Sequence, residues 1–209
     1  MDFNLTERAE TARTKIRNIV DDQIIPLEND KSNYDNHENI AAEPLEELKK
    51  LTKEADLWSL SLPEKWGGQG FSMTEIAPCY EEMNRSIFGP VCFNASAPDD
   101  GNMRVLSQVA SSAQQNKWLP PIAEGKVRSS FIMTEPHPGS GSDPSMMKTC
   151  AERKGDKWII NGHKWYITGA GIAEHFILIA RTSEDARKGL SAFLFHRDTP
   201  GWHIKRRIP

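Results

Sequence analysis

The sequence predicts a multidomain α+β chain, in which an all-α N-terminal domain precedes an antiparallel, β-barrel-like domain. Up to about residue 125, apolar residues recur at spacings of three and four, which is typical of amphipathic helices. After Gly125 they form short runs bounded by Gly, Pro and Asn, which is typical of β-strands. We therefore expect a helical domain over residues 1–126 and a β domain over residues 127–209.

Five helical windows are expected in the first domain. Ser72 and Glu75 form a capping box at the start of the third window, whereas Pro120-Pro121 argues against a continuous fifth helix. Between the second and third windows, closely spaced glycines and Pro63 predict a tight loop that Trp66 anchors to the core. The windows are residues 4–28, 41–55, 72–83, 99–110 and 111–124.

Short strands are expected in the second domain. The dipeptide Asn161-Gly162 predicts a type I′ hairpin turn, because both central residues of that turn need positive φ. This turn would join Trp158–Ile160 to Lys164–Ile167, and Lys154-Gly155-Asp156 marks another turn. The other expected strands lie around Phe131 and Met133, Met146-Met147, residues 176–179 and residues 192–195.

Composition and charge exclude several classes of partner. The 209 residues carry 26 basic and 29 acidic side chains, a net charge of −3, so no nucleic-acid partner is expected, and Lys205–Arg207 is expected to be a solvated strand end. Three dispersed cysteines argue against a disulfide framework or zinc site and favour a reducing compartment. No apolar stretch reaches transmembrane length, and the acidic N-terminus is unlike a presequence. We therefore expect a cytoplasmic protein with no membrane partner.

Several common catalytic motifs are missing from the sequence. The six histidines share neither H-x-x-x-H nor H-E-x-x-H spacing, so no metal site is expected. There is no Walker P-loop and no G-x-S-x-G elbow. The lone Gly139-Ser140-Gly141 precedes strands rather than a helix, which argues against a Rossmann site.

The stretch Phe131–Asp143 is the first candidate for ligand binding. An apolar run ends at Thr134-Glu135-Pro136 and opens into a loop of glycines and serines, whose backbone can approach an anionic or polar cofactor closely. An ordinary surface loop would have the same composition. Burial could make Glu135 a general base, but no second catalytic group is adjacent. A structural role, in which Glu135 accepts hydrogen bonds from loop N–H groups, is therefore favoured.

Tyr166 and Thr168 are the second candidate. If residues 164–168 form a strand, alternation puts both side chains on one face, opposite Trp165 and Ile167. Such a face could stack on a flat heteroaromatic ring and hydrogen-bond to it. It could equally be the solvent-facing side of an amphipathic strand.

Five motifs, taken in order, resemble the acyl-CoA dehydrogenase family of flavoenzymes over nearly the whole chain. They straddle the change from helices to strands, at the point where the family has the same change. The motifs are Leu62–Gly70, Ala97–Met103, Lys117–Pro121, Thr134–Asp143 and Ile160–Thr168.

The resemblance implies an N-terminal helical domain, a middle β-barrel and a C-terminal four-helix domain, with FAD between the last two. The implied cofactor contacts are Phe131, Met133, Thr134, Gly141, Ser142, Tyr166, Ile167 and Thr168. Ser140 and Ser142 are the implied substrate contacts, because the loop is longer than the commonest family form and either serine could take the family role.

The implied reaction is α,β-dehydrogenation of an acyl-CoA thioester in fatty acid metabolism, with electrons passing through FAD to an electron-transferring flavoprotein. In the family, the catalytic glutamate and much of a homodimer or homotetramer interface belong to the C-terminal helical domain, which we expect to be absent here. No residue of this chain is therefore expected to be the base, and the chain alone is expected to be inactive. The alternatives are a truncated, non-catalytic module that binds a partner chain, or an acyl-CoA oxidase, nitroalkane oxidase or flavin monooxygenase of the same fold.

Overall fold

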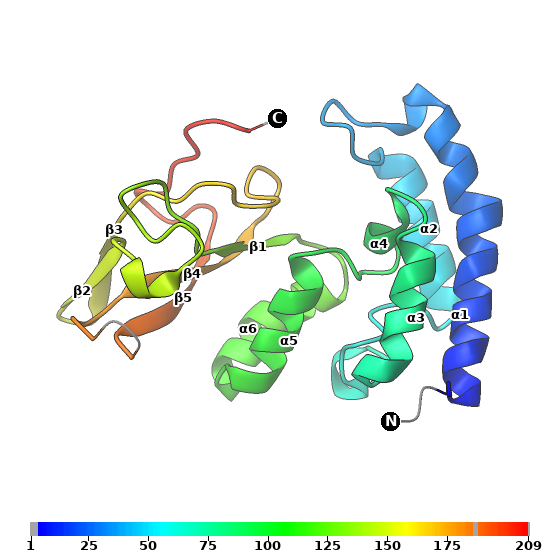
Figure 1. Cartoon of the computed structure of the whole chain (residues 1–209), viewed down its shortest axis with the longest axis horizontal. Helices are drawn as coiled ribbons and strands as arrows, with labels where there is room; N and C mark the ends of the chain where they lie inside the picture. The colour runs from blue at the N-terminus through cyan, green and yellow to red at the C-terminus, as the bar shows by residue number, and fades with distance from the viewer. Residues whose placement is uncertain (1–3, 186–187, 209) are drawn as a thin grey trace. The chain divides into compact units, whose positions relative to one another are not determined.

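The computed structural model describes residues 4–185 and 188–208. The chain divides into two compact units, Met1–Gly125 and Lys126–Pro209. Figure 1 shows that the first unit is helical and that the second is built on a β-sheet. Each unit has an apolar core of its own. The predicted class, a helical N-terminal part followed by a sheet domain, is confirmed.

The helical unit contains the expected helices and one short helix that was not predicted. Thr6 caps the first helix, which then changes to a π-helical turn, Val20–Ile24, and a 3-10 turn, Ile25–Asn29. The prediction that Pro120-Pro121 interrupts the last helix is wrong, since this helix runs through both residues. Each proline lacks a backbone donor, but its fixed φ lies in the helical range. The α-helices are α1 (Glu7–Ile19), α2 (Ala42–Glu54), α3 (Met73–Met83), α4 (Gly89–Cys92), α5 (Asp99–Val109) and α6 (Ser112–Ala123).

Two buried carboxylates of α3 tie this helix to α1, which lies beside it in Figure 1. Glu75 accepts hydrogen bonds from Arg8 and Thr6, each at 2.8 Å, and completes the predicted capping box. Glu82 accepts a hydrogen bond from Arg17. The arginine partners hold the pKa of Glu75 well below its ordinary range and lower the pKa of Glu82 to about 2. Both side chains are therefore ionised links between the helices at neutral pH.

The tight loop expected between α2 and α3 depends on a glycine that approaches backbone closely. Trp66 is half-buried and ends a 3-10 turn, and Gly67 follows it with a φ of +84°. At Gly68, a Cβ atom would lie only 2.0 Å from the carbonyl oxygen of Leu62. The chain can fold back on itself here only because Gly68 has no side chain.

The sheet unit contains a five-stranded sheet in the order β1-β4-β2-β3, with β5 also paired to β4. The strands are β1 (Ser129–Ile132), β2 (Cys150–Lys154), β3 (Lys157–Asn161), β4 (His175–Arg181) and β5 (Leu190–His196). β4 pairs with β5 in antiparallel register but with β1 and β2 in parallel. The sheet is thus mixed rather than purely antiparallel, and it is open over the described residues. The parallel pairings are possible because long connections separate β1 and β2 from β4 in sequence.

The Asn161-Gly162 hairpin prediction is wrong. The hairpin joins β2 to β3, with Lys154 opposite Lys157 and the two-residue turn Gly155-Asp156 between them. Gly155 has a φ of +65°, which the turn requires, and the predicted turn at this position is confirmed. Gly162 serves a different purpose: a Cβ atom there would lie 2.2 Å from Oγ1 of Thr149.

Two other expected strands are also absent. Residues 163–167 are irregular and form no ladder, and Pro144–Met146 is a 3-10 turn rather than the strand predicted around Met146-Met147. In this turn Asp143 accepts hydrogen bonds from both the backbone and the hydroxyl of Ser145. This capping by a local side chain competes with strand formation.

Gly68→Ala should destabilise the helical unit by about 1–3 kcal/mol, because the added methyl group would overlap backbone atoms. Gly101→Ala is the matched control: it lies in α5, where a Cβ atom would meet no atom within 4 Å. This control should be neutral or stabilising by up to about 1 kcal/mol. Urea denaturation measures both free energies of unfolding, and equal values for the two variants would contradict the packing described for the loop.

Candidate functional site

The structure brings the end of β1 beside the segment that follows β3. The backbone oxygen of Met133 accepts a hydrogen bond from Nζ of Lys164 at 2.7 Å, and that of Thr134 accepts one from the backbone N–H of Trp165 at 3.1 Å. Ser130 of β1 completes the contact, since its hydroxyl donates to the backbone oxygen of Thr168 at 2.8 Å. Two of the stretches singled out in the sequence are therefore neighbours in space.

The Gly/Ser loop folds back onto the same strand end. Glu135 and Gly141 form an isolated antiparallel bridge, in which the Glu135 N–H donates to the Gly141 oxygen at 3.3 Å. Gly141 has a φ of +54°, a backbone conformation that favours glycine. Ser142 is exposed, whereas Ser140 is buried and its hydroxyl donates to the Gly141 oxygen. Of the two serines considered for substrate binding, only Ser142 is accessible.

The carboxylate of Glu135 is the polar centre of this arrangement. Its side chain is 2% exposed and accepts hydrogen bonds from the backbone N–H groups of Ser140 (3.2 Å), Lys148 (2.7 Å) and Thr149 (2.8 Å). It also forms an ion pair of 3.0 Å with Lys164, whose side chain is 6% exposed. These contacts show Glu135 as an acceptor of loop N–H groups, which is the structural role that the sequence analysis favoured for it.

The charge state of Glu135 follows from these contacts. Burial alone would raise its pKa, but the hydrogen bonds from Thr149, Lys148 and Lys164 outweigh burial and lower the pKa to about 2. Burial lowers the pKa of Lys164, and the neighbouring carboxylate opposes that change. Glu135 is therefore ionised at neutral pH and is too weak a base to remove a proton from carbon.

The aromatic part of the candidate site differs from the predicted strand. Tyr166 has a φ of +51°, so the expected alternation of side chains about a strand axis does not apply. Tyr166 is nevertheless 63% exposed, and its ring centroid lies 4.7 Å from that of Trp165. Thr168 is exposed as well, whereas Ile167 packs against the core of the sheet unit. Tyr166 and Thr168 are thus both accessible, although not because they share a strand face.

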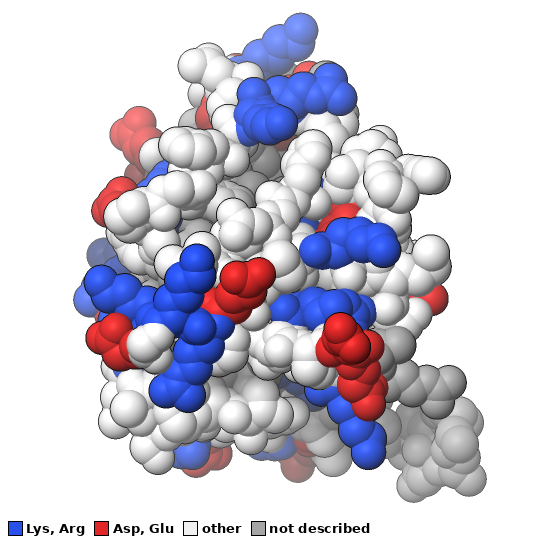
Figure 2. Space-filling model, turned by 90° about the vertical axis from the view of Figure 1, so that its left-hand side faces the viewer, with Lys and Arg blue, Asp and Glu red and all other residues white. Residues whose placement is uncertain are grey.

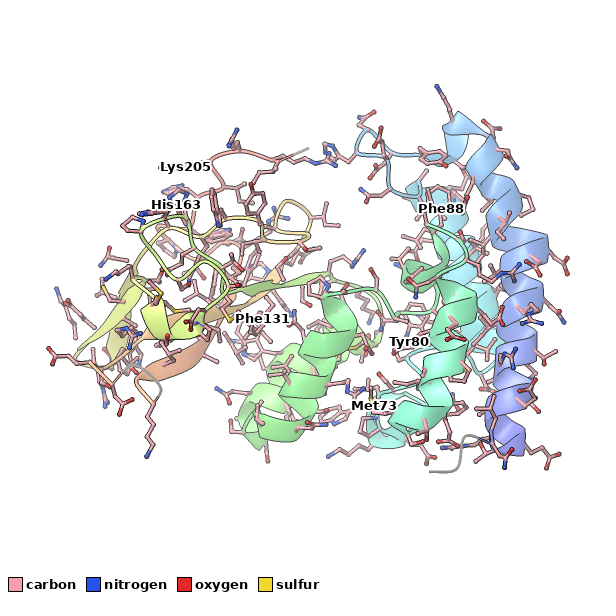
Figure 3. The ribbon with its side chains drawn as sticks, viewed as in Figure 1. Met73, Tyr80, Phe88, Phe131, His163 and Lys205 are labelled. Carbon is pink, nitrogen blue, oxygen red and sulfur yellow. The ribbon has the colours of Figure 1, made fainter. Side chains whose placement is uncertain are left out.

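Figure 3 labels Phe131, which is half-buried on β1, and His163, which lies exposed after β3.

Lys164 and Thr149 were not identified as site residues from the sequence. Lysine is rarely buried unless it is paired, and the partner here lies 29 positions away, so no local pattern signals the pair. Thr149 is fully buried next to Gly162. The only feature of the sequence that could have indicated its role is that glycine, which Thr149 approaches closely.

These residues suit a planar, partly polar ligand. Exposed aromatic rings at Trp165 and Tyr166 can stack on a flat ring, and the hydroxyls of Ser142 and Thr168 can hydrogen-bond to its polar edge. Within residues 4–185 and 188–208, no group of three His, Cys, Asp or Glu side chains could hold a metal ion. In the same part of the chain, no helix is both long and apolar enough to span a bilayer. The rings of Trp165 and Tyr166, with the hydroxyls of Ser142 and Thr168, fit an aromatic cofactor such as a flavin.

Comparison with known proteins agrees with this fold. Residues 6–126 match the N-terminal domain of acyl-CoA dehydrogenases, and residues 130–209 match the middle domain. Both matches assign the chain to one family of multidomain proteins. More narrowly, it belongs to the acyl-CoA dehydrogenase family, and the resemblance seen in its motifs is confirmed.

Individual relatives match the whole chain. It is 35% identical to FadE2 of Mycobacterium tuberculosis, a probable acyl-CoA dehydrogenase, over 100% of this chain and 53% of that protein. A solved structure assigned as an acyl-CoA dehydrogenase, from Mycobacterium abscessus, has a TM-score of 0.89 at 34% identity and covers 99% of this chain and 54% of that one. The FAD complex of PigA has a TM-score of 0.80 at 26% identity, with coverages of 100% and 53%. The chain thus spans about half the length of these relatives.

Glu135 should remain ionised far below the ordinary glutamate pKa of 4.5, because its folded-state pKa is about 2. Since the pKa is lower in the folded than in the unfolded chain, the ionised carboxylate contributes stability above pH 4.5, and this contribution is lost as the pH falls towards 2. Carbon-13 NMR of the side-chain carboxyl measures this titration directly. A midpoint near 4.5 in the folded chain would contradict the contacts described above.

Proposed function

We propose that this chain forms part of the flavin site of an FAD-dependent acyl-CoA dehydrogenase, which removes hydrogen from the α and β carbons of an acyl-CoA thioester. The observation that carries the proposal is the convergence of three segments: the end of β1, the Gly/Ser loop and residues 164–168. The three segments hold seven of the eight candidate cofactor contacts, and the eighth, Phe131, lies on β1 itself.

Each candidate contact would have a distinct part in holding the cofactor. Tyr166, with Trp165 beside it, offers an aromatic surface for stacking. Met133 and Thr134 offer the chain at the end of β1 as a further surface for the cofactor. Ser142 and Thr168 offer exposed hydroxyls for the polar groups of the cofactor or the acyl-CoA. When bound, FAD supplies the acceptor for the hydride that leaves the β carbon.

The catalytic base is not among the candidate residues in this proposal. Two carboxylates are adjacent in sequence to the candidate contacts. Glu135 is 2% exposed and paired with Lys164, and Asp143 accepts hydrogen bonds from the backbone and hydroxyl of Ser145. The low pKa of Glu135 and its lack of access to a ligand suit a fixed structural anion. We therefore assign proton abstraction to a carboxylate outside the candidate residues, so the chain alone is proposed to be inactive.

The remaining parts of the proposal come from the family. Electrons would leave through an electron-transferring flavoprotein, and the complete protein would act as a cytoplasmic homodimer or homotetramer in fatty acid metabolism.

Figure 2 shows basic and acidic side chains close together on the displayed face, with uncharged surface between them. The displayed face therefore has no broad basic patch of the kind that binds a nucleic acid.

The protein, expressed in the form that its gene encodes, should be yellow with bound flavin, and a substrate acyl-CoA should bleach the flavin absorbance under anaerobic conditions. A panel of straight, branched and aromatic acyl-CoA thioesters identifies the substrate. Oxygen consumption during turnover would indicate an oxidase instead. A colourless protein that takes up no FAD would contradict the proposal.

A further inference from the structure

The ion pair between Glu135 and Lys164 is the buried polar feature that joins all three candidate segments. Its four donors come from separate parts of the chain: Ser140 in the loop, Lys148 and Thr149 before β2, and Lys164 after β3. Glu135 itself follows the end of β1. Hydrogen bonds to a buried carboxylate are directional and strong, so one side chain sets where several backbone segments lie.

Lys164 adds a second link. Its ammonium group lies 3.0 Å from Glu135 and donates to the backbone oxygen of Met133 at 2.7 Å. The neighbouring backbone N–H of Trp165 bonds to Thr134. The residue that neutralises Glu135 therefore also fixes the aromatic segment against the strand end.

Two glycines let the segments come close enough for these bonds. A Cβ atom at Gly139 would lie 2.4 Å from Oε2 of Glu135, and one at Gly162 would lie 2.2 Å from Oγ1 of Thr149. Arg181 holds the far end of the loop separately, because its guanidinium donates to the backbone oxygens of Ser145 and Met147. Loss of the Glu135 charge should therefore loosen residues 139–141 while the loop stays attached further on.

We infer that Glu135 and Lys164 are positioning residues of the flavin site, and that their ion pair sets the placement of the three segments relative to one another. This inference rests on the proposed function. A buried ion pair often adds little net stability compared with apolar side chains of similar size. Its contribution here is the geometry of the candidate contacts. Removal of one charge leaves the other buried and unpaired, so each single variant should also lose stability, and the tests below measure the geometry separately from that loss.

The first test needs no cofactor. Glu135→Gln keeps the size of the side chain and removes its charge, and Glu152→Gln makes the same change at an exposed position on β2. In the 209-residue chain, amide hydrogen exchange at Ser140, Lys148 and Thr149 should become about tenfold faster or more in Glu135→Gln, because these amides lose a charged acceptor. Glu152→Gln should leave them unchanged, and unchanged exchange in Glu135→Gln would overturn the inference.

The second test uses FAD as the probe, in the protein as its gene encodes it. Lys164→Met and Glu135→Gln should weaken FAD binding by about 10- to 100-fold and alter the visible circular dichroism of the flavin that remains bound. Lys164→Arg, which keeps the charge, should restore much of both. If the pair only stabilised the fold, the substitutions would lower the melting temperature and the bound fraction but leave the spectrum of bound flavin unchanged. That result would overturn the inference.

The two tests separate the inference from the proposed function. If the amides respond as expected but the unaltered protein binds no FAD, the segments are positioned as inferred and the proposed function is wrong. If the unaltered protein binds FAD and neither its spectrum nor the amides respond to the substitutions, the proposed function stands and the inference fails.

Discussion

The sheet unit depends on one buried anion. Glu135 has no access to solvent, so its charge must be balanced by hydrogen bonds and by a cation. Three backbone N–H groups and the ammonium group of Lys164 provide that balance. Because these donors are distant in sequence, the need to solvate a single carboxylate brings together the strand end, the Gly/Ser loop and the aromatic segment.

The helical unit uses buried carboxylates for a different purpose. Glu75 and Glu82 pair with arginines of α1 that remain partly exposed, and these pairs join α1 to α3. Those pairs lie at a helix–helix contact, whereas the Glu135 pair joins irregular segments that have no ladder of their own. An irregular backbone needs such side-chain acceptors, because its N–H groups cannot be satisfied by neighbouring strands or turns.

Local patterns were enough to predict every α-helix of the helical unit except the short α4, together with the Ser72 capping box and the Gly155 turn, since each depends on residues a few positions apart. The parallel pairing of β1 with β4 depends on distant contacts and could not be predicted in this way. Gly162 was misinterpreted because a glycine needed for close approach looks the same in sequence as one needed for positive φ. The structural role of Glu135 was predicted, but its partner Lys164 was not, because nothing local distinguishes a buried lysine from an exposed one.

The most direct measurement is a titration of the nitrogen-15-labelled chain with FAD, followed by amide chemical shifts. If the three segments form a flavin surface, the largest shifts should fall on Met133, Thr134, Gly141, Ser142, Tyr166 and Thr168, with the amides bound to Glu135 responding next. Shifts confined to the helical unit, or scattered over the sheet unit without these residues, would contradict a flavin site built around the Glu135–Lys164 pair.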